Sequence, residues 1–405
     1  MLRVEAGSAG FSLRMTEIHL AFAELIRELH KKSGQPVVVL VDEYDKPILD
    51  NITDPDTARE LREGLRNFYS VLKAQGAHLR FVMLTGVSKF SKVSLFSGLN
   101  NLKDISLDKR YGTLCGYTQQ ELVTTFHEHL NGLDLAEIQQ WYNGYNFLAE
   151  PVYNPFDVLL YLDSQQFKPY WFETGTPTFL VDLIYKRKIA ASSLERLEIT
   201  DTFMGSFDVD SIEPEPLLFQ TGYLTILKEE SYPGGIFYTL GFPNHETRYA
   251  FNNALLSKLG QTGVEQDRHK LALMRILQKN ELDKLRDLFH VFFASIPHDW
   301  YRKNTIAGYE GYYCSVVYCY FAALGLNVIP EESTNHGQID MTVLFNERVY
   351  IFEFKVNELT GPERALAQIK KKKYYEKYAG QEMYLIGIEF SKDDRNITRF
   401  EWEKC

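Results

Sequence analysis

The feature that most constrains the fold is an uninterrupted apolar run, Val37–Val41, that is followed directly by Asp42 and Glu43. Such a run is typical of a strand that is buried on both faces of a parallel sheet. A second apolar run, residues 81–84, is followed by the segment 85–88, which contains two hydroxyl residues. The sequence therefore predicts an α/β layer in which polar residues gather at the carboxyl ends of the strands, where such folds bind ligands.

The rest of the chain divides into helical and mixed regions. Helical patterns at residues 16–32 and 57–75 precede the two apolar runs. Residues 116–299 are mainly helical, with aromatic-rich turns that we interpret as loops packed on a helical core. The last hundred residues follow the order helix, three strands, helix, strand. We therefore expect three parts, with boundaries at 1–115, 116–299 and 300–405.

Composition excludes several classes of protein. The 405 residues are 45% apolar, 24% charged and 14% aromatic, as in folded globular proteins and unlike disordered chains. No apolar run approaches the about 18 residues of a membrane span, and the first residues have no signal-peptide pattern. The cysteines have neither metal-ligand spacing nor that of a disulfide framework, so we expect a cytoplasmic protein; they are Cys115, Cys314, Cys319 and Cys405.

The charge is unevenly distributed along the chain. The net charge is −10, which by itself argues against a nucleic-acid partner. Residues 301–405, however, hold 14 basic and 15 acidic residues, so nearly all of the negative charge lies upstream of them. They also contain Lys370–Lys373, followed by Tyr374 and Tyr375. This basic stretch is either a solvated helix face or a contact for a phosphate backbone.

The strongest candidate site lies on a predicted hairpin of residues 338–345 and 348–356. Glu353 and Lys355 are two apart on a strand, so their side chains point to the same face. Asp340 lies on the partner strand, within reach of Glu353 across the ladder. Two converging carboxylates suit Mg²⁺, and a neighbouring lysine can orient or deprotonate the attacking water. The alternative is a surface hairpin in which Lys355 simply pairs with an acid.

The order of elements around this hairpin resembles the PD-(D/E)XK nuclease superfamily, in the branch fused behind an AAA-ATPase-like domain. Asp340, Glu353 and Lys355 match its acidic–gap–Glu-x-Lys core, although Ile339 stands where a proline gives the motif its name. The resemblance implies a restriction-endonuclease-like α-β-β-β-α-β fold and metal-dependent phosphodiester hydrolysis. It also implies two further site residues, Glu310 on the preceding helix and Gln368 on the following helix.

The first apolar run resembles the Walker B strand of P-loop ATPases. In that resemblance Asp42 holds Mg²⁺ through water and Glu43 polarises the water that attacks ATP. Residues 44–47 and 84–90 are similar to the AAA-ATPase-like family, which implies that Thr85 or Ser88 occupies the sensor position. The other interpretation is an acidic strand end that binds no nucleotide.

The phosphate-binding loop of such an ATPase is absent from the sequence. No Gly-x-x-x-x-Gly-Lys-Ser/Thr occurs, so little remains to bind the β and γ phosphates. We expect the strand that carries this loop to lie between residues 37–41 and 80–84. Its loss would expose two strand edges. We favour a truncated start over a natural remnant whose ATPase half is inactive. ATP binding then requires N-terminal residues that are missing here. Alternatively, a homo-oligomer or a partner protein completes the sheet.

We therefore expect an intracellular, prokaryotic-type α/β protein. It combines an incomplete P-loop NTPase-like sheet, a helical middle region and a nuclease-like domain that cleaves DNA with Mg²⁺. The competing hypothesis is a non-catalytic regulator that binds nucleotide or nucleic acid, in which the acid–lysine cluster is structural. A third hypothesis is a protein with a purely structural role in interactions.

Overall fold

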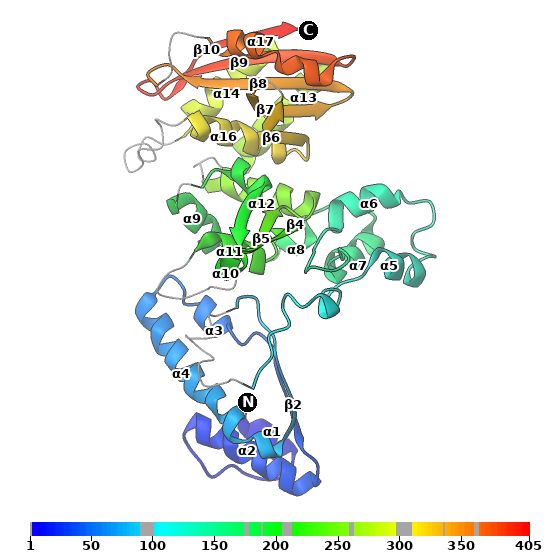
Figure 1. The fold of residues 1–405 in the computed structure, drawn as a ribbon, viewed down its shortest axis with the longest axis vertical. Coiled ribbons are helices and arrows are strands. Elements are labelled where there is room, and N and C mark those ends of the chain that lie inside the picture. Colours follow the sequence, from blue (N-terminus) through cyan, green and yellow to red (C-terminus); the bar gives the residue numbers. More distant parts are fainter. Residues whose placement is uncertain are drawn as a thin grey trace. The chain divides into compact units, whose positions relative to one another are not determined.

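The computed structural model describes residues 2–89, 101–173, 178–187, 189–204, 213–258, 263–296, 310–334, 337–359 and 364–405 (Figure 1). The chain forms two compact units. The first comprises Met1–Tyr111, Ile199–Gly222 and Glu229–Tyr238, and the second comprises Gly112–Glu198, Tyr223–Lys228 and Thr239–Cys405. Among the described residues, no helix has both the length and the apolar character needed to cross a bilayer.

The first unit contains a parallel pair of strands, β1 (Val37–Val41) and β2 (Leu79–Leu84). The strand predicted at 37–41 is confirmed, and the second begins two residues earlier than predicted. The amphipathic helix α2 ends where Gly34 adopts a left-handed conformation. Asp54 caps the start of α4, and its side chain accepts a hydrogen bond from the Thr57 amide. The helices of this part are α1 (Leu2–Ser8), α2 (Ile18–Ser33), α3 (Lys46–Leu49), α4 (Pro55–Ala74) and the 3₁₀ turns η1 (Gly76–His78) and η2 (Lys109–Tyr111).

Two expectations about this sheet are wrong. No strand lies between β1 and β2, because the two strands pair directly, with Val38 opposite Phe81. The sheet is also not buried on both faces. Val38, Leu40 and Phe81 are 52%, 70% and 53% exposed, whereas Val39 is buried. The apolar composition of β1 therefore marks a face that the described residues leave uncovered.

A three-stranded sheet in the order β3-β5-β4 follows further along the chain, in a region predicted to be mainly helical. Strand β4 is largely polar beyond its first three residues, so most of it gives no apolar signal in the sequence. The elements are β3 (Leu197–Thr200), β4 (Thr225–Tyr232) and β5 (Gly235–Gly241), with helices α10 (Asp201–Met204) and α11 (Pro214–Gln220).

The second unit begins with a set of helices whose aromatic turns pack closely, as predicted. A Cβ on Gly144 would meet the Pro243 carbonyl oxygen at 2.0 Å, so the turn at 141–147 lies against the segment before α12. The helices are α5 (Gln119–Thr125), α6 (Leu135–Tyr142), α7 (Pro155–Ser164), α8 (Tyr170–Glu173), α9 (Thr178–Arg187), η3 (Ala191–Glu195), α12 (His245–Lys258), α13 (Gly263–Lys279) and α14 (Asp283–Ala294).

The C-terminal part is a five-stranded sheet in the order β10-β9-β8-β7-β6. Strands β6 to β8 are antiparallel, β8 and β9 are parallel, and β10 returns antiparallel to β9. The sequence predicted neither β10 nor the break after α17, where Lys373 adopts φ 50°. The elements are α16 (Glu310–Ala322), β6 (Asn327–Thr334), β7 (Gly337–Phe345), β8 (Arg348–Val356), α17 (Ala365–Lys372), η5 (Tyr374–Tyr378), β9 (Glu382–Ser391) and β10 (Asn396–Lys404).

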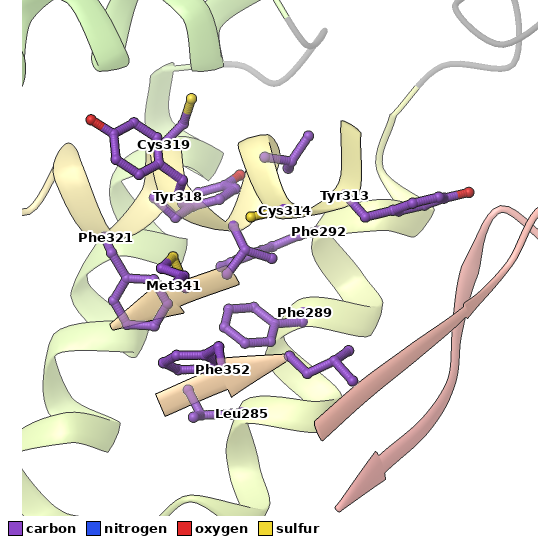
Figure 2. Close-up of a cluster of buried hydrophobic side chains, with 14 of the residues drawn as sticks. Leu285, Phe289, Phe292, Tyr313, Cys314, Tyr318, Cys319, Phe321, Met341 and Phe352 are labelled. Atoms are coloured by element: carbon purple, nitrogen blue, oxygen red, sulfur yellow. The ribbon is translucent and has the colours of Figure 1, made fainter. Parts of the chain in front are cut away.

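The two faces of this sheet bury different cores. One core joins α14 and α16 to alternate residues of β7 and β8, including Phe289, Tyr318, Met341 and Phe352 (Figure 2). The other face packs against α17 and η5 through residues such as Ile369. The side chains of β8 that do not point into the first core therefore lie beneath α17.

Candidate active site

Strand β8 places Glu353 and Lys355 on one face of the C-terminal sheet. Phe352 and Phe354 point into the core formed with α14 and α16, so the alternation of the strand sends Glu353 and Lys355 the other way. Both are nearly buried, with 1% and 6% of their surfaces exposed. A surface hairpin would leave these charges in water, so the structure does not fit that alternative.

Asp340 is fixed by a hydrogen bond to the backbone of β8. Its Oδ2 accepts from the Phe354 amide at 2.8 Å. Phe354 is the residue between Glu353 and Lys355, so this bond holds the Asp340 carboxylate beside that pair. The structure therefore brings together the acid, acid and lysine that the sequence singled out.

Gln368 reaches the same site from α17. Its side-chain amide donates a hydrogen bond to Oε1 of Glu353. Helix α17 can lie this close because Gly387, opposite Glu353 on β9, has no side chain. A Cβ at Gly387 would be 2.4 Å from the Leu366 amide nitrogen.

Tyr374 is a site residue that the sequence did not assign. It is buried, and its hydroxyl lies 3.1 Å from the position of a Cβ on Gly337. Burial raises the pKa of Tyr374, and the Glu353 and Asp340 carboxylates raise it further. Its hydroxyl also bonds to the side chain of Gln368. A continuous helix would not turn Tyr374 toward Gln368, and the break at Lys373 was not evident from the sequence.

The donor set fits a hard divalent cation. Asp340 and Glu353 supply carboxylate oxygens, the ligands that Mg²⁺ prefers. Glu310 is the first residue of α16, and its side chain lies outside the described residues. Among the side chains that are described, no group of three or more His, Cys, Asp and Glu residues could hold a metal ion. The described side chains would contribute two carboxylates here, a number that Mg²⁺ sites commonly use together with water.

The lysine run lies on the exposed surface of α17 and beyond its end. Lys370 pairs with Glu403 at 2.8 Å, and Lys373 pairs with Glu376 at 3.5 Å. Exposed pairs of this kind contribute little to stability. The run is a solvated face in this structure, and these lysines stay accessible to an anionic ligand.

The candidate nucleotide residues lie at the ends of β1 and β2. Thr85 donates its hydroxyl to Oδ1 of Asp42 at 2.6 Å, as expected for residues at adjacent strand ends. Ser88 instead donates its hydroxyl to the buried Asp45 at 2.7 Å. Glu43 is exposed and has φ 52°. Asp42 and Thr85 are therefore brought together, whereas Ser88 is part of a separate, buried contact.

Comparison with protein families gives two matches. Residues 4–96 match a family described as a predicted AAA-ATPase, AAA-ATPase-like. Residues 308–400 match the PD-(D/E)XK nuclease superfamily. The second range contains Asp340, Glu353, Lys355, Gln368 and Glu310.

Comparison with curated proteins finds a relative from Azotobacter chroococcum mcd 1, described as an uncharacterized protein in the vnfD 5′ region. It is 53% identical over 402 residues, which cover 99% of this chain and 78% of the relative. No solved structure matches the chain.

Proposed function

The chain belongs to the family in which a predicted AAA-ATPase-like domain is joined to a PD-(D/E)XK nuclease superfamily domain, and we propose that its C-terminal part is a Mg²⁺-dependent DNA nuclease. The observation that carries this proposal is the nearly buried pair of Glu353 and Lys355, with Asp340 bonded to the backbone between them. Charged groups are seldom buried together for stability alone, because desolvation offsets most of their attraction.

Each residue has a distinct role in this proposal. Asp340 and Glu353 would hold Mg²⁺, which when bound offsets negative charge on the phosphate and lowers the pKa of water. Lys355 orients the attacking water and stabilises the charge that develops on the phosphoryl oxygens. Gln368 keeps one oxygen of Glu353 engaged and so fixes the direction of the other.

Substitution at the site tests the proposal. Lys355→Ala and Asp340→Ala are each expected to abolish Mg²⁺-dependent nicking of plasmid DNA while the circular dichroism spectrum stays that of wild type. Equal nicking by the wild type and both variants would refute the site.

Calorimetric titration with Mg²⁺ separates the nuclease from a non-catalytic regulator. A nuclease binds Mg²⁺ in the wild type and loses that binding in Asp340→Ala. A regulator with a structural acid–lysine cluster shows no Mg²⁺ binding that depends on Asp340.

We also propose that the chain has three parts, with boundaries at 1–115, 116–299 and 300–405. We propose in addition that the protein is located in a prokaryotic cytoplasm. The first part would bind ATP through Asp42, Glu43 and Thr85 only with a phosphate-binding loop from residues beyond this chain or from a partner. The exposed face of Val38, Leu40 and Phe81 supports this, since a helix from such additional residues would cover it. A fluorescent ATP analogue should bind a form of the protein that carries such a loop and should not bind this chain alone.

A further inference from the structure

Three polar side chains from different helices meet in the interior of the second unit. Tyr318 on α16 donates its hydroxyl to Oε1 of Glu195, the last residue of η3. Arg248 on α12 holds the same carboxylate, with its Nε 3.0 Å from Oε1 and its Nη2 3.3 Å from Oε2. Tyr318 is fully buried, and the side chains of Glu195 and Arg248 are only 16% and 20% exposed. We call these three residues the Glu195 clamp.

The Glu195 clamp joins the matched nuclease domain to the helical region before it. Tyr318 lies within the C-terminal family match, whereas Glu195 and Arg248 lie outside both matches. A second bond links the same elements, because the Ala191 amide of η3 donates to Oγ of Ser315 on α16 at 3.0 Å. Positions three apart are neighbours on a helix surface, so η3 holds one face of α16 at two points.

The same helix also contacts a proposed metal ligand. Cys314 precedes Tyr318 by four residues, so both lie on one face of α16. The Sγ of Cys314 is 4.0 Å from the carbonyl oxygen of Asp340. Figure 2 shows Cys314 and Tyr318 on α16, in the core that also holds Met341, the residue after Asp340. The β7 backbone at Asp340 therefore packs directly against α16.

The polar character of the Glu195 clamp suits a positioning role. A buried ion pair adds little net stability, because desolvation offsets most of the attraction between its charges. Its bonds are directional, however, and a fully bonded buried network selects one arrangement of the elements that it joins. The remaining contacts of α16 in this core are mainly apolar and fix its position less strictly.

We propose that Glu195 and Arg248 are positioning residues of the nuclease site, although they lie outside the matched nuclease domain. Through Tyr318 they fix α16, and α16 fixes the part of β7 that carries Asp340. This inference rests on the proposed nuclease function and deepens it, because Mg²⁺ binding at Asp340 then depends on the helical region. Residues 308–400 alone would lack part of what arranges their site.

Tyr318→Phe in the full chain tests the Glu195 clamp, because it removes the hydroxyl and keeps both the ring and the pair of Glu195 with Arg248. Hydrogen-exchange protection of α16 and of β7 near Asp340 should fall by about 10- to 100-fold, since a bond to a charged group is lost. In calorimetric titration the Kd for Mg²⁺ should rise by about 3- to 30-fold. Saturating Mg²⁺ should restore most of the wild-type nicking rate, because the ligands themselves are unchanged.

Tyr142→Phe is the matched control. It also removes a buried tyrosine hydroxyl, which donates to the Lys168 carbonyl oxygen at 3.0 Å in the helical region. Its Kd for Mg²⁺ should be that of wild type. Glu195→Gln, which removes the charge that holds Arg248, should raise the Kd in the same direction as Tyr318→Phe. The double variant should raise it by less than the product of the two single effects, because the residues act as one unit.

Three outcomes decide between the explanations. Unchanged exchange of α16 and β7 in Tyr318→Phe would overturn the Glu195 clamp, and this result does not depend on Mg²⁺. Lowered protection with a wild-type Kd, or the same rise of the Kd in Tyr142→Phe, would show that the three residues do not position the site. A wild type that binds no Mg²⁺ would instead refute the proposed function, and exchange would still show whether the Glu195 clamp holds β7. If Tyr318→Phe does not fold, Glu195→Gln gives the same test.

Discussion

The side-chain amide of Gln368 on α17 donates a hydrogen bond to the carboxylate of Glu353 on β8. This contact ties the helix that covers the sheet to the acid at its centre. Gln368 also bonds to the hydroxyl of Tyr374, so one carboxamide joins three side chains of the site. The orientation of Glu353 therefore depends on the position of α17.

Replacing Gln368 with Leu should lower Mg²⁺-dependent nicking by about 10- to 100-fold, as is usual when the hydrogen-bond partner of a metal ligand is removed. Leucine keeps most of the volume but leaves Glu353 without the amide donor. Steady-state nicking rates at saturating and limiting Mg²⁺ measure the effect, which should be larger at limiting Mg²⁺. Gln381→Leu, at an exposed position after η5, is the matched control. Equal rates for both variants would contradict this role.

Gly387→Ala should destabilise the C-terminal domain by about 1–3 kcal/mol, because the new methyl group overpacks the contact with α17. It should also lower nicking, since a displaced α17 carries Gln368 away from Glu353. Urea unfolding followed by circular dichroism measures the stability. Gly311→Ala, in the helix α16 with no atom within 4 Å of the added Cβ, should be neutral or slightly stabilising. The same loss in both variants would rule out this packing explanation.

Glu332 should make the free energy of unfolding of the C-terminal domain depend on pH in the acidic range. Burial favours a higher pKa for Glu332, but the Lys377 ion pair and hydrogen bonds from Tyr378 and Thr342 outweigh it, and the net pKa is lowered. A carboxylate with a lowered pKa stabilises the fold above its unfolded value, 4.5, and loses that contribution as the pH falls below it.

Glu332→Gln should therefore lower the free energy of unfolding at pH 7 by about 1–3 kcal/mol and by much less near pH 3.5. Urea unfolding of wild type and variant at both pH values measures the difference. Glu347→Gln, at the turn between β7 and β8, is the control. A loss that is as large at pH 3.5 as at pH 7 would show that Glu332 contributes by packing and not by charge.

Much of the C-terminal site was predictable because its elements are short, regular and apolar on one side. The spacing of Glu353 and Lys355 on a strand fixes their common face, and the hairpin brings Asp340 to them. Tyr374 could not be predicted in the same way. Its direction depends on the left-handed turn at Lys373, and a lysine gives no signal for such a turn.

The N-terminal sheet, in contrast, could be predicted only in part. The apolar run at 37–41 predicted a strand, but composition does not say which strand pairs with it or what covers each face. The direct pairing of Val38 with Phe81 and the exposure of Leu40 depend on the tertiary structure. The length of β4 could not be predicted for a related reason, since most of its side chains do not enter a core.

The most direct measurement of the central claim is Mg²⁺-dependent nicking of supercoiled plasmid by wild type and by Glu353→Gln. Glutamine keeps the size of Glu353 and can still accept the Gln368 hydrogen bond, but it removes the negative charge that would hold the metal. We predict Mg²⁺-dependent nicking by the wild type, and a rate at least about 100-fold lower in a folded Glu353→Gln. Wild-type activity in the variant, or nicking by the wild type that does not require a divalent cation, would contradict it.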